Sequence, residues 1–284
     1  MGMSSYDELE DRVLTMVDAG NWEDAYEMVL EGDSNGNADS TALLAQFYQY
    51  GLGVPKDMQR AIELYGKAIG FGQSKAATLL GDLYLKGDEM LPANISKAVT
   101  YYQKGADLGD SEAMGYLGNC YIYGEGVPEN PDLAFEWTQR AAKSGSVLGI
   151  YNLAVCFDDG IGTPKDPFQA VYWYKNSLNI TPDDDFIMYR LGCCLADPYE
   201  VYGIIPTQDM LKEAYDWICK AVEKGNVKAH IIIAWFYEFG KVVRQDFDTA
   251  HKYMKIAADN GDEFAEELLG RYRKNIYGNY YIPQ

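Results

Sequence analysis

Apolar residues recur along this chain at spacings of three, four and seven positions, which places them on one face of a helix. One such segment reads Leu-Gly-x-x-Tyr-x-x-Gly-x-Gly-Val and is clearest at Leu117, Gly118, Tyr121 and Gly124. Complete or partial copies of this segment begin at Leu44, Leu80, Leu153, Leu191, Ile233 and Leu269. Because the pattern returns along most of the chain, it predicts an array of similar helices.

A second helical segment follows each copy. It carries an alanine, a large or aromatic residue three positions later, and a small residue seven positions later. The alanines are Ala61, Ala98, Ala134, Ala170, Ala214 and Ala250, at spacings of 37, 36, 36, 44 and 36 residues. A unit of this length holds two helices and their turns, so we call the first segment helix A and the second helix B.

Small residues and turn residues indicate how the two helices of a unit pack. Gly118 of helix A is expected to face Ala134 of helix B, which lets the two helix axes approach closely. Gly124 stands where helix A should end, because a left-handed cap favours glycine. Pro128 follows and cannot continue the helix. The sequence therefore predicts antiparallel helix pairs.

The combined pattern resembles the Sel1-like repeat family, relatives of the tetratricopeptide repeat. That family also places an alanine four residues before the motif leucine, and this chain has Ala76, Ala113, Ala229 and Ala265 in that slot. The resemblance covers roughly residues 38–270. It implies an all-α fold, a right-handed α/α superhelical solenoid of about six to seven antiparallel helix pairs, which acts as a scaffold for protein–protein interaction.

The repeat register divides the chain into a cap, an array and a tail. Residues 1–37 give a looser helix pair that caps the array at its N-terminal end. The repeats are expected at about residues 39–75, 76–112, 113–148, 149–186, 187–228 and 229–264. Residues 265–284 are expected to form a C-terminal capping helix and tail.

The fifth unit departs from the pattern at two places. An insertion over residues 197–206 replaces its Gly-x-Gly-Val turn, and residues 181–185 lengthen the turn before its helix A. Together they account for the single 44-residue spacing. Loops often carry function, so Tyr199, Tyr202 and Ile204 of the insertion are candidate contacts for a partner.

Charge narrows the class of partner. The 284 residues include 24 tyrosines and carry a formal net charge of −19. Phosphate binding relies on clustered Lys and Arg, so we expect neither a nucleic-acid partner nor an anionic membrane surface. Two explanations of the excess Asp and Glu remain open, namely solubility and an acidic groove that selects basic partners.

Titratable side chains form no recognisable catalytic or metal-binding motif. His230 and His251 lack the His-Glu-x-x-His spacing of a zinc site. The acidic run at residues 183–185 lacks the spacing and the closing Glu of an EF-hand. We therefore expect no catalytic residues, no metal and no cofactor. A site assembled across repeats is the one way in which the chain could be an enzyme.

Three of the five cysteines occupy one repeat position. Cys120, Cys156 and Cys194 each lie three residues after the motif leucine, a slot that faces the interior in this pattern. Equivalent positions in successive units should lie about 8–10 Å apart or more, which is too far for a disulfide. Reduced thiols, an acidic start without a signal peptide and no apolar run of roughly 18 residues favour a cytoplasmic protein. A monomer is the simplest expectation.

Helix A usually lines the concave surface along which solenoid proteins bind their partners. Its variable slots lie two before, two after and five after the motif leucine, and this spacing puts them on one face. The candidate binding residues are Asp82, Asn119, Tyr151, Asp158, Tyr189, Trp235 and Glu238. In this hypothesis the aromatic residues anchor a partner and the acidic residues meet its Lys or Arg. Alternatively, the aromatic residues pack between units.

The pattern as a whole favours an interaction scaffold or adaptor that binds a protein or peptide, with a basic segment as a candidate ligand. An effector or inhibitor that binds and modulates a target enzyme would use the same surface. The residues alone do not separate these two functions.

Overall fold

Two compact units make up the chain, residues 1–149 and residues 150–284. The computed structural model describes residues 4–197, 201–203, 205–275 and 278–283. Fifteen helices occur in these described residues, and the only strands there are two of two residues each. The predicted all-α solenoid architecture is confirmed.

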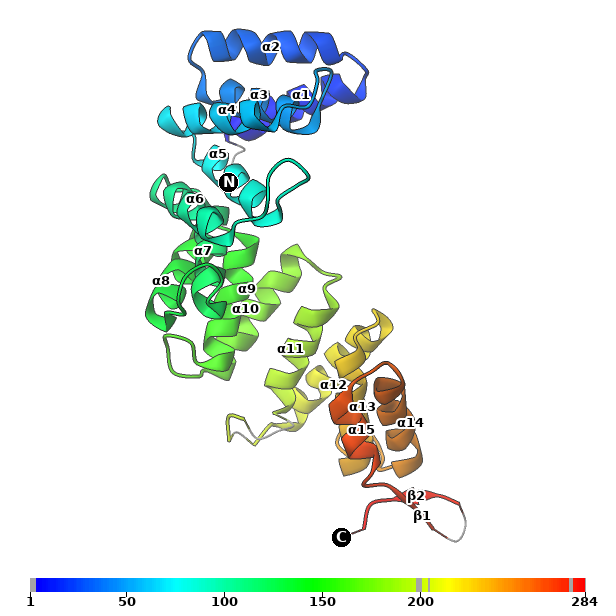
Figure 1. Cartoon of the computed structure of the whole chain (residues 1–284). Coiled ribbons are helices and arrows are strands. Elements are labelled where there is room, and N and C mark those ends of the chain that lie inside the picture. The colour runs from blue at the N-terminus through cyan, green and yellow to red at the C-terminus, as the bar shows by residue number, and fades with distance from the viewer. Residues whose placement is uncertain (1–3, 198–200, 204, 276–277, 284) are drawn as a thin grey trace. The chain divides into compact units, whose positions relative to one another are not determined.

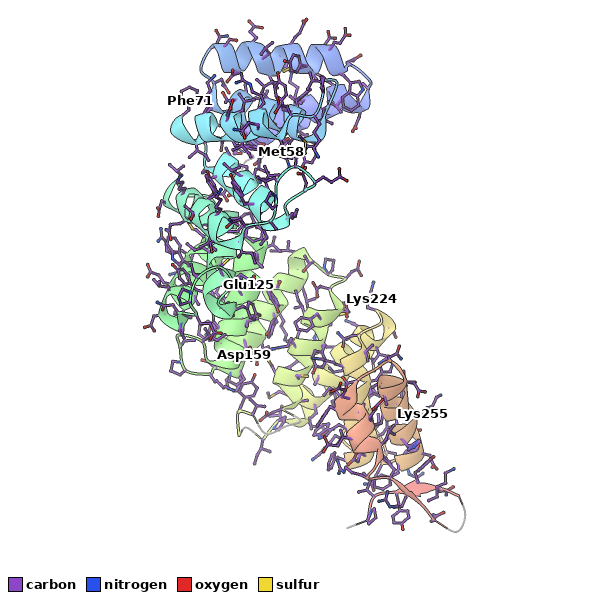
Figure 2. The ribbon with its side chains drawn as sticks, in the orientation of Figure 1. Met58, Phe71, Glu125, Asp159, Lys224 and Lys255 are labelled. Atoms are coloured by element: carbon purple, nitrogen blue, oxygen red, sulfur yellow. The ribbon has the colours of Figure 1, made fainter. Side chains whose placement is uncertain are left out.

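The first unit is a succession of paired helices, coloured blue to green in Figure 1. Its helices are α1 (Ser5–Asp18), α2 (Trp22–Ser34), α3 (Ala38–Tyr50), α4 (Met58–Gly70), α5 (Ser74–Lys86), α6 (Ile95–Asp107), α7 (Ser111–Tyr123) and α8 (Pro131–Lys143). Helix A packs on helix B in the pairs α3–α4, α5–α6 and α7–α8. In Figure 2, Met58 lies at the beginning of α4 and Phe71 directly after its end.

The second unit begins within α9 (Val147–Asp159) and continues the alternation of helices A and B. Its further elements are α10 (Pro167–Ile180), α11 (Asp185–Ala196), α12 (Gln208–Glu223), α13 (Val227–Phe239), α14 (Phe247–Asp259), α15 (Glu263–Leu269), β1 (Arg273–Lys274) and β2 (Tyr280–Tyr281). The pairs α11–α12 and α13–α14 pack closely. The two strands pair as a short antiparallel hairpin after α15.

Polar caps explain where the helices begin and end. At the start of helix B, a side chain accepts a hydrogen bond from a backbone N–H three residues later. Asp57 accepts from Arg60 N at 2.9 Å, and Asn130 accepts from Leu133 N at 3.1 Å. Helix A ends in the left-handed conformation, with φ of 69° at Gly124. These caps satisfy backbone groups that the helix cannot pair internally.

The core consists of the motif leucines and a row of helix B tyrosines. The leucines Leu44, Leu80, Leu117, Leu153 and Leu191 are at most 2% exposed. Full burial of such a side chain stabilises the fold by about 1.5–3 kcal/mol. Tyr65, Tyr102 and Tyr174, each four residues after the helix B alanine, are also fully buried. The repeat pattern therefore sets the hydrophobic core.

Gly118 shows why a small residue follows the motif leucine. A Cβ at this position would lie 2.6 Å from Cγ2 of Thr138 and 3.2 Å from its backbone nitrogen. Real Cβ atoms do not tolerate the first distance, so α7 and α8 approach this closely only because of the glycine. The predicted close approach of helices A and B is confirmed here.

The cysteines of the shared slot are interior, as the register predicts. Cys120, Cys156 and Cys194 are buried, and none of the five cysteines forms a disulfide. Burial raises the pKa of Cys120 to about 11, which keeps this thiol protonated at neutral pH. These residues serve as small hydrophobic side chains.

Candidate partner-binding faces

The helix A face of the first unit centres on Asp82 and Tyr102. The Tyr102 hydroxyl, from α6, donates to Oδ1 of Asp82 on α5 at 2.7 Å. Burial raises the pKa of Asp82 above its ordinary value, although the bond from Tyr102 acts against this shift. Asp82 also lines a hollow of about 320 Å³ together with Gln49, Tyr50 and Lys86. A half-buried carboxylate thus stands at a concave surface between α3 and α5.

A second hollow, of about 170 Å³, contains Asn119 on α7. Tyr102 and Tyr116 also line it, and their rings stack with centroids 4.8 Å apart. Tyr102 therefore connects the two regions, since it bonds Asp82 and lines the hollow that contains Asn119. An asparagine amide both donates and accepts hydrogen bonds, so it can pair with the backbone of an extended peptide.

Asp158, in the second unit, is the centre of a buried hydrogen-bond network. It is 6% exposed and accepts from Tyr174 Oη at 2.9 Å and from Arg190 Nε at 2.8 Å. Cys194 Sγ contacts its other oxygen at 3.3 Å. A partner's lysine would have to displace Arg190 to reach this carboxylate. Asp158 therefore stabilises its own unit by joining α9 to side chains of α10 and α11.

The insertion after α11 reaches the same carboxylate. The Tyr202 hydroxyl donates to Oδ1 of Asp158, so two sequence-predicted site residues are brought together. Asp197 begins the insertion with φ of 42°, in the left-handed conformation that glycine adopts in other units. Its side chain accepts from Val201 N at 2.7 Å. Two further candidates, Tyr199 and Ile204, lie outside the described residues.

Glu238 is likewise engaged inside the second unit. It is 6% exposed, and its carboxylate accepts from Arg271 Nη2 and from Tyr272 Oη, each at 3.1 Å. Arg271 and Tyr272 both follow α15, so their bonds to Glu238 hold the C-terminal segment against α13. Asp158 and Glu238 thus share a role, because each ties its helix A to a later segment.

The aromatic candidates of the second unit remain partly accessible. Tyr151, Tyr189 and Trp235 are each half-buried on their helix A. The Trp235 ring lies 5.5 Å from that of Phe239, which is 51% exposed. Tyr151 also packs on Tyr174, with centroids 6.3 Å apart. Each ring therefore combines packing inside the unit with a surface open to solvent.

Several side chains on these faces were missed by the sequence analysis. Gln49, Tyr50 and Phe239 lie five or six residues after the motif leucine, in slots that the pattern could have flagged. Tyr102 stands on helix B, and no helix A pattern points to it. Arg190 directly precedes the motif Leu191, but only the fold reveals that it faces Asp158.

Metal-binding clusters and membrane-spanning helices are both lacking among the residues that the structure describes. None of these residues form a group of three or more His, Cys, Asp or Glu side chains that could hold a metal ion. Among the described helices, none is long and apolar enough to span a membrane.

The repeat can be compared with known families. The family model for the Sel1 repeat matches residues 38–69, 74–110, 111–146, 147–177, 188–226 and 227–262. This chain belongs to the Sel1 repeat family. The resemblance noted from its motifs is thus confirmed, and repeats of this type generally mediate protein–protein interaction. Residues 178–187 fall between two matched Sel1 repeats, where the sequence indicates a lengthened turn.

Two solved structures are similar over most of this Sel1 repeat chain. A protective antigen of uropathogenic Escherichia coli strains with an SLR fold is 25% identical, with a TM-score of 0.72. The match covers 87% of this chain and 51% of the antigen, so this chain spans about half of that protein's length. A Sel1 repeat protein from Oxalobacter formigenes is 26% identical, with a TM-score of 0.64, over 87% of this chain and 95% of that one.

A more distant likeness is to YrrB, described as a TPR protein with an unusual peptide-binding site. It is 18% identical, with a TM-score of 0.53, over 74% of this Sel1 repeat chain and 98% of YrrB. This likeness shows the fold alone. No curated protein sequence matches the chain.

Proposed function

We propose that this chain is a non-catalytic adaptor that binds a protein or peptide through the helix A faces of its Sel1 repeats. The observation that carries the proposal is the contrast between slots on helix A. The motif leucines are fully buried, whereas Asp82, Asn119 and Trp235, each two residues after its motif residue, keep part of their side chains accessible. A carboxylate, an amide and an indole at half-exposed positions remain available for contact with a partner.

The chemistry of the two faces supports different contacts. In the first unit, Asn119 offers an amide for a peptide backbone, and Asp82 offers a carboxylate for a Lys or Arg of the partner. In the second unit, Trp235, with Tyr151 and Tyr189, offers apolar rings, which commonly dominate interface energetics. The net charge of −19 adds a field that attracts a basic partner. We place this activity in the cytoplasm, supported by five cysteines that form no disulfide. We further propose that the protein acts as a monomer.

Affinity capture with quantitative mass spectrometry tests the proposal. The full chain, immobilised, is compared with Trp235→Ala and with Asn119→Ala in a lysate of the source cell. Tyr172→Ala is the matched control, because Tyr172 is a 57% exposed aromatic residue on helix B. We expect at least one protein to be lost by both helix A variants and retained by Tyr172→Ala. Equal capture by all four proteins would contradict the proposal.

A further inference from the structure

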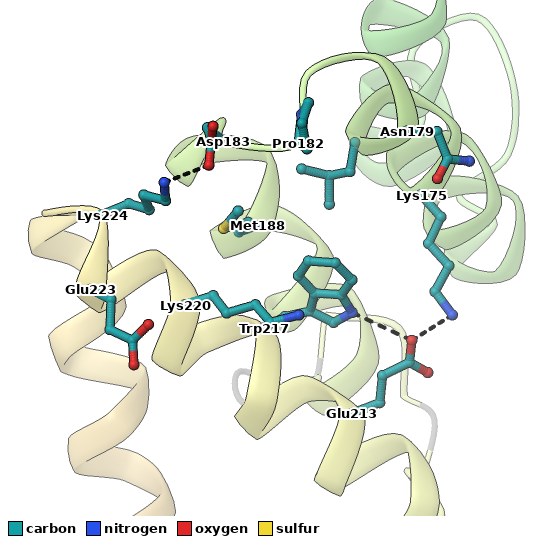
Figure 3. Close-up of a pocket in the computed structure, with 11 residues that line it drawn as sticks. Lys175, Asn179, Pro182, Asp183, Met188, Glu213, Trp217, Lys220, Glu223 and Lys224 are labelled. Atoms are coloured by element: carbon teal, nitrogen blue, oxygen red, sulfur yellow. Dashed lines mark hydrogen bonds and ion pairs between the residues drawn. The ribbon is translucent and has the colours of Figure 1, made fainter.

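The second unit contains a hollow of about 680 Å³ on the side of its B helices, away from the helix A slots discussed above. It lies between α10, α11 and α12, as Figure 3 shows. Leu178, Met188 and Trp217 give it an apolar lining, and Pro182 stands at one edge. This is the place where the sequence departs from the repeat, because Pro182 belongs to the lengthened turn before α11.

Trp217 occupies a slot that is buried in some units, as at Leu64 and Trp137, and half-buried in others, as at Trp173. The equivalent Trp137, three residues after its helix B alanine, is 7% exposed. Trp217 is only half-buried and lines the hollow. The other B-to-A turns contain a glycine with positive φ, such as Gly109 at 93°, whereas the turn before α11 has none. The altered turn therefore coincides with an indole left open on one side.

Four of the six charged side chains that line the hollow are paired with one another, and Glu223, like Lys220, has no ion pair among the described residues. Lys175 Nζ lies 2.6 Å from Oε1 of Glu213, and Lys224 pairs with Asp183. Lys220 is different, because its Nζ lies 4.0 Å from the centroid of the Trp217 ring and, among described residues, no carboxylate lies within ion-pair distance of it. Figure 3 shows Lys220 reaching toward the indole.

We propose that this hollow is a second docking site, which takes one large apolar side chain of a partner protein next to a carboxylate. The apolar side chain would pack against Leu178, Met188 and Trp217, in the manner of a hot-spot pocket. The adjacent carboxylate would pair with Lys220, the one lysine of the rim without a carboxylate partner. Charge complementarity thus selects an acidic neighbour, which distinguishes this ligand from the basic segment proposed for the helix A faces.

Blocked dipeptides test the site directly on the full chain. The five tryptophans are labelled as 5-fluorotryptophan, and Trp217→Phe assigns the ¹⁹F signal of Trp217. The probes are acetyl-Glu-Phe-amide, acetyl-Lys-Phe-amide and acetyl-Glu-Gly-amide. We expect the first to shift the Trp217 signal saturably, the second to bind about three-fold more weakly because a rim ion pair contributes little, and the third to cause no shift.

Two variants assign the charge preference to its residue. Lys220→Gln should remove the preference for Glu over Lys and still allow the phenylalanine to bind. Lys212→Gln, an exposed lysine on the same helix outside the hollow, should leave the preference intact. The proposal is overturned if no phenylalanine peptide shifts the Trp217 signal, or if the unmodified chain binds the Glu and Lys peptides equally. Neither result bears on the helix A faces, whose test uses different residues.

Discussion

Arg190 Nε lies 2.8 Å from Oδ2 of Asp158, so a guanidinium on α11 is held against a nearly buried carboxylate on α9. The two residues stand 32 positions apart, close to one repeat length. Tyr174 and Tyr202 donate to the same carboxylate. This ion pair therefore joins two successive A helices and the insertion that follows the second one.

Replacing this carboxylate should weaken the second unit. In Asp158→Asn the Arg190 side chain, 23% exposed, loses its main counter-charge, and the Tyr202 bond to the insertion weakens. We expect a loss of about 3 kcal/mol in the free energy of unfolding, measured by urea titration. Asp159→Asn is the control, because Asp159 also contacts Arg190 but is 47% exposed, and it should cost little. Equal losses in the two variants would refute a special role for Asp158.

Asp158 also illustrates what the sequence could and could not predict. The repeat register placed Asp158 on the accessible face of helix A. The excess of acidic residues had two open explanations, solubility and an acidic groove for a basic partner. The partners of Asp158 could not be predicted, because Arg190 lies on the next helix A and Tyr202 lies in a segment that follows no repeat. Leu153 and Cys156 of the same helix were predicted as interior residues, because burial of the repeated slots depends only on the helical period.

Two helical glycines should respond oppositely to alanine. In Gly118→Ala the new Cβ meets Thr138, so we expect a loss of about 1–3 kcal/mol from overpacking. In Gly66→Ala no atom lies within 4 Å of the new Cβ. Because Gly66 lies inside α4, alanine there should stabilise the protein by about 0.5–1 kcal/mol. Thermal unfolding of both variants checks the pair, and a stabilising Gly118→Ala would contradict the close helix contact.

The stability contributed by Asp82 should depend on pH. Its pKa is raised by burial, so the folded state binds this proton more tightly than the unfolded state. The ionised carboxylate therefore costs stability at pH 7, and the cost falls as pH drops through the raised pKa. We expect Asp82→Asn to raise the Tm at pH 7, and its advantage to shrink on acidification.

Asp33 provides the opposite case in the same unit. Burial acts to raise its pKa, but hydrogen bonds from Lys67 and Thr41 outweigh burial, so the pKa is lowered. Its stabilising contribution is present at neutral pH and is lost as pH falls through the lowered pKa. Asp33→Asn should therefore lower the Tm at pH 7 and lose this effect in acid. If the Tm of the Asp33→Asn and Asp82→Asn variants, each relative to the unmodified chain, changed with pH in the same direction, the lowered pKa of Asp33 and the raised pKa of Asp82 could not both be right.

His251 should titrate below its ordinary pKa of 6.5. Burial lowers this pKa, and Lys255 and Lys274 add to the effect. The Tyr280 ring covers the imidazole, with centroids 3.6 Å apart. NMR titration of the histidine Cε1–H signals should place His251 below 6.5, and Tyr280→Ala should bring the pKa closer to 6.5 by exposing the ring. An unchanged pKa in Tyr280→Ala would contradict the contact between the hairpin and α14.

The candidate binding faces were only partly predictable. Asp82, Asn119 and Trp235 were predicted because they occupy a variable slot of a regular helix. The hollow at Trp217 could not be predicted, since it forms between side chains of α10, α11 and α12 that no repeat pattern brings together. The sequence nevertheless marked this turn as the place where the repeat changes.

The most direct test of the helix A proposal is the dissociation constant of a partner obtained by affinity capture. Purified partner is titrated into the unmodified chain, Trp235→Ala and Tyr172→Ala, with isothermal calorimetry as the readout. We predict that Trp235→Ala weakens binding by about 30-fold, as expected for a hot-spot residue worth about 2 kcal/mol, and that Tyr172→Ala binds as tightly as the unmodified chain. Full affinity in Trp235→Ala, or an equal loss of affinity in Tyr172→Ala, would contradict the helix A proposal.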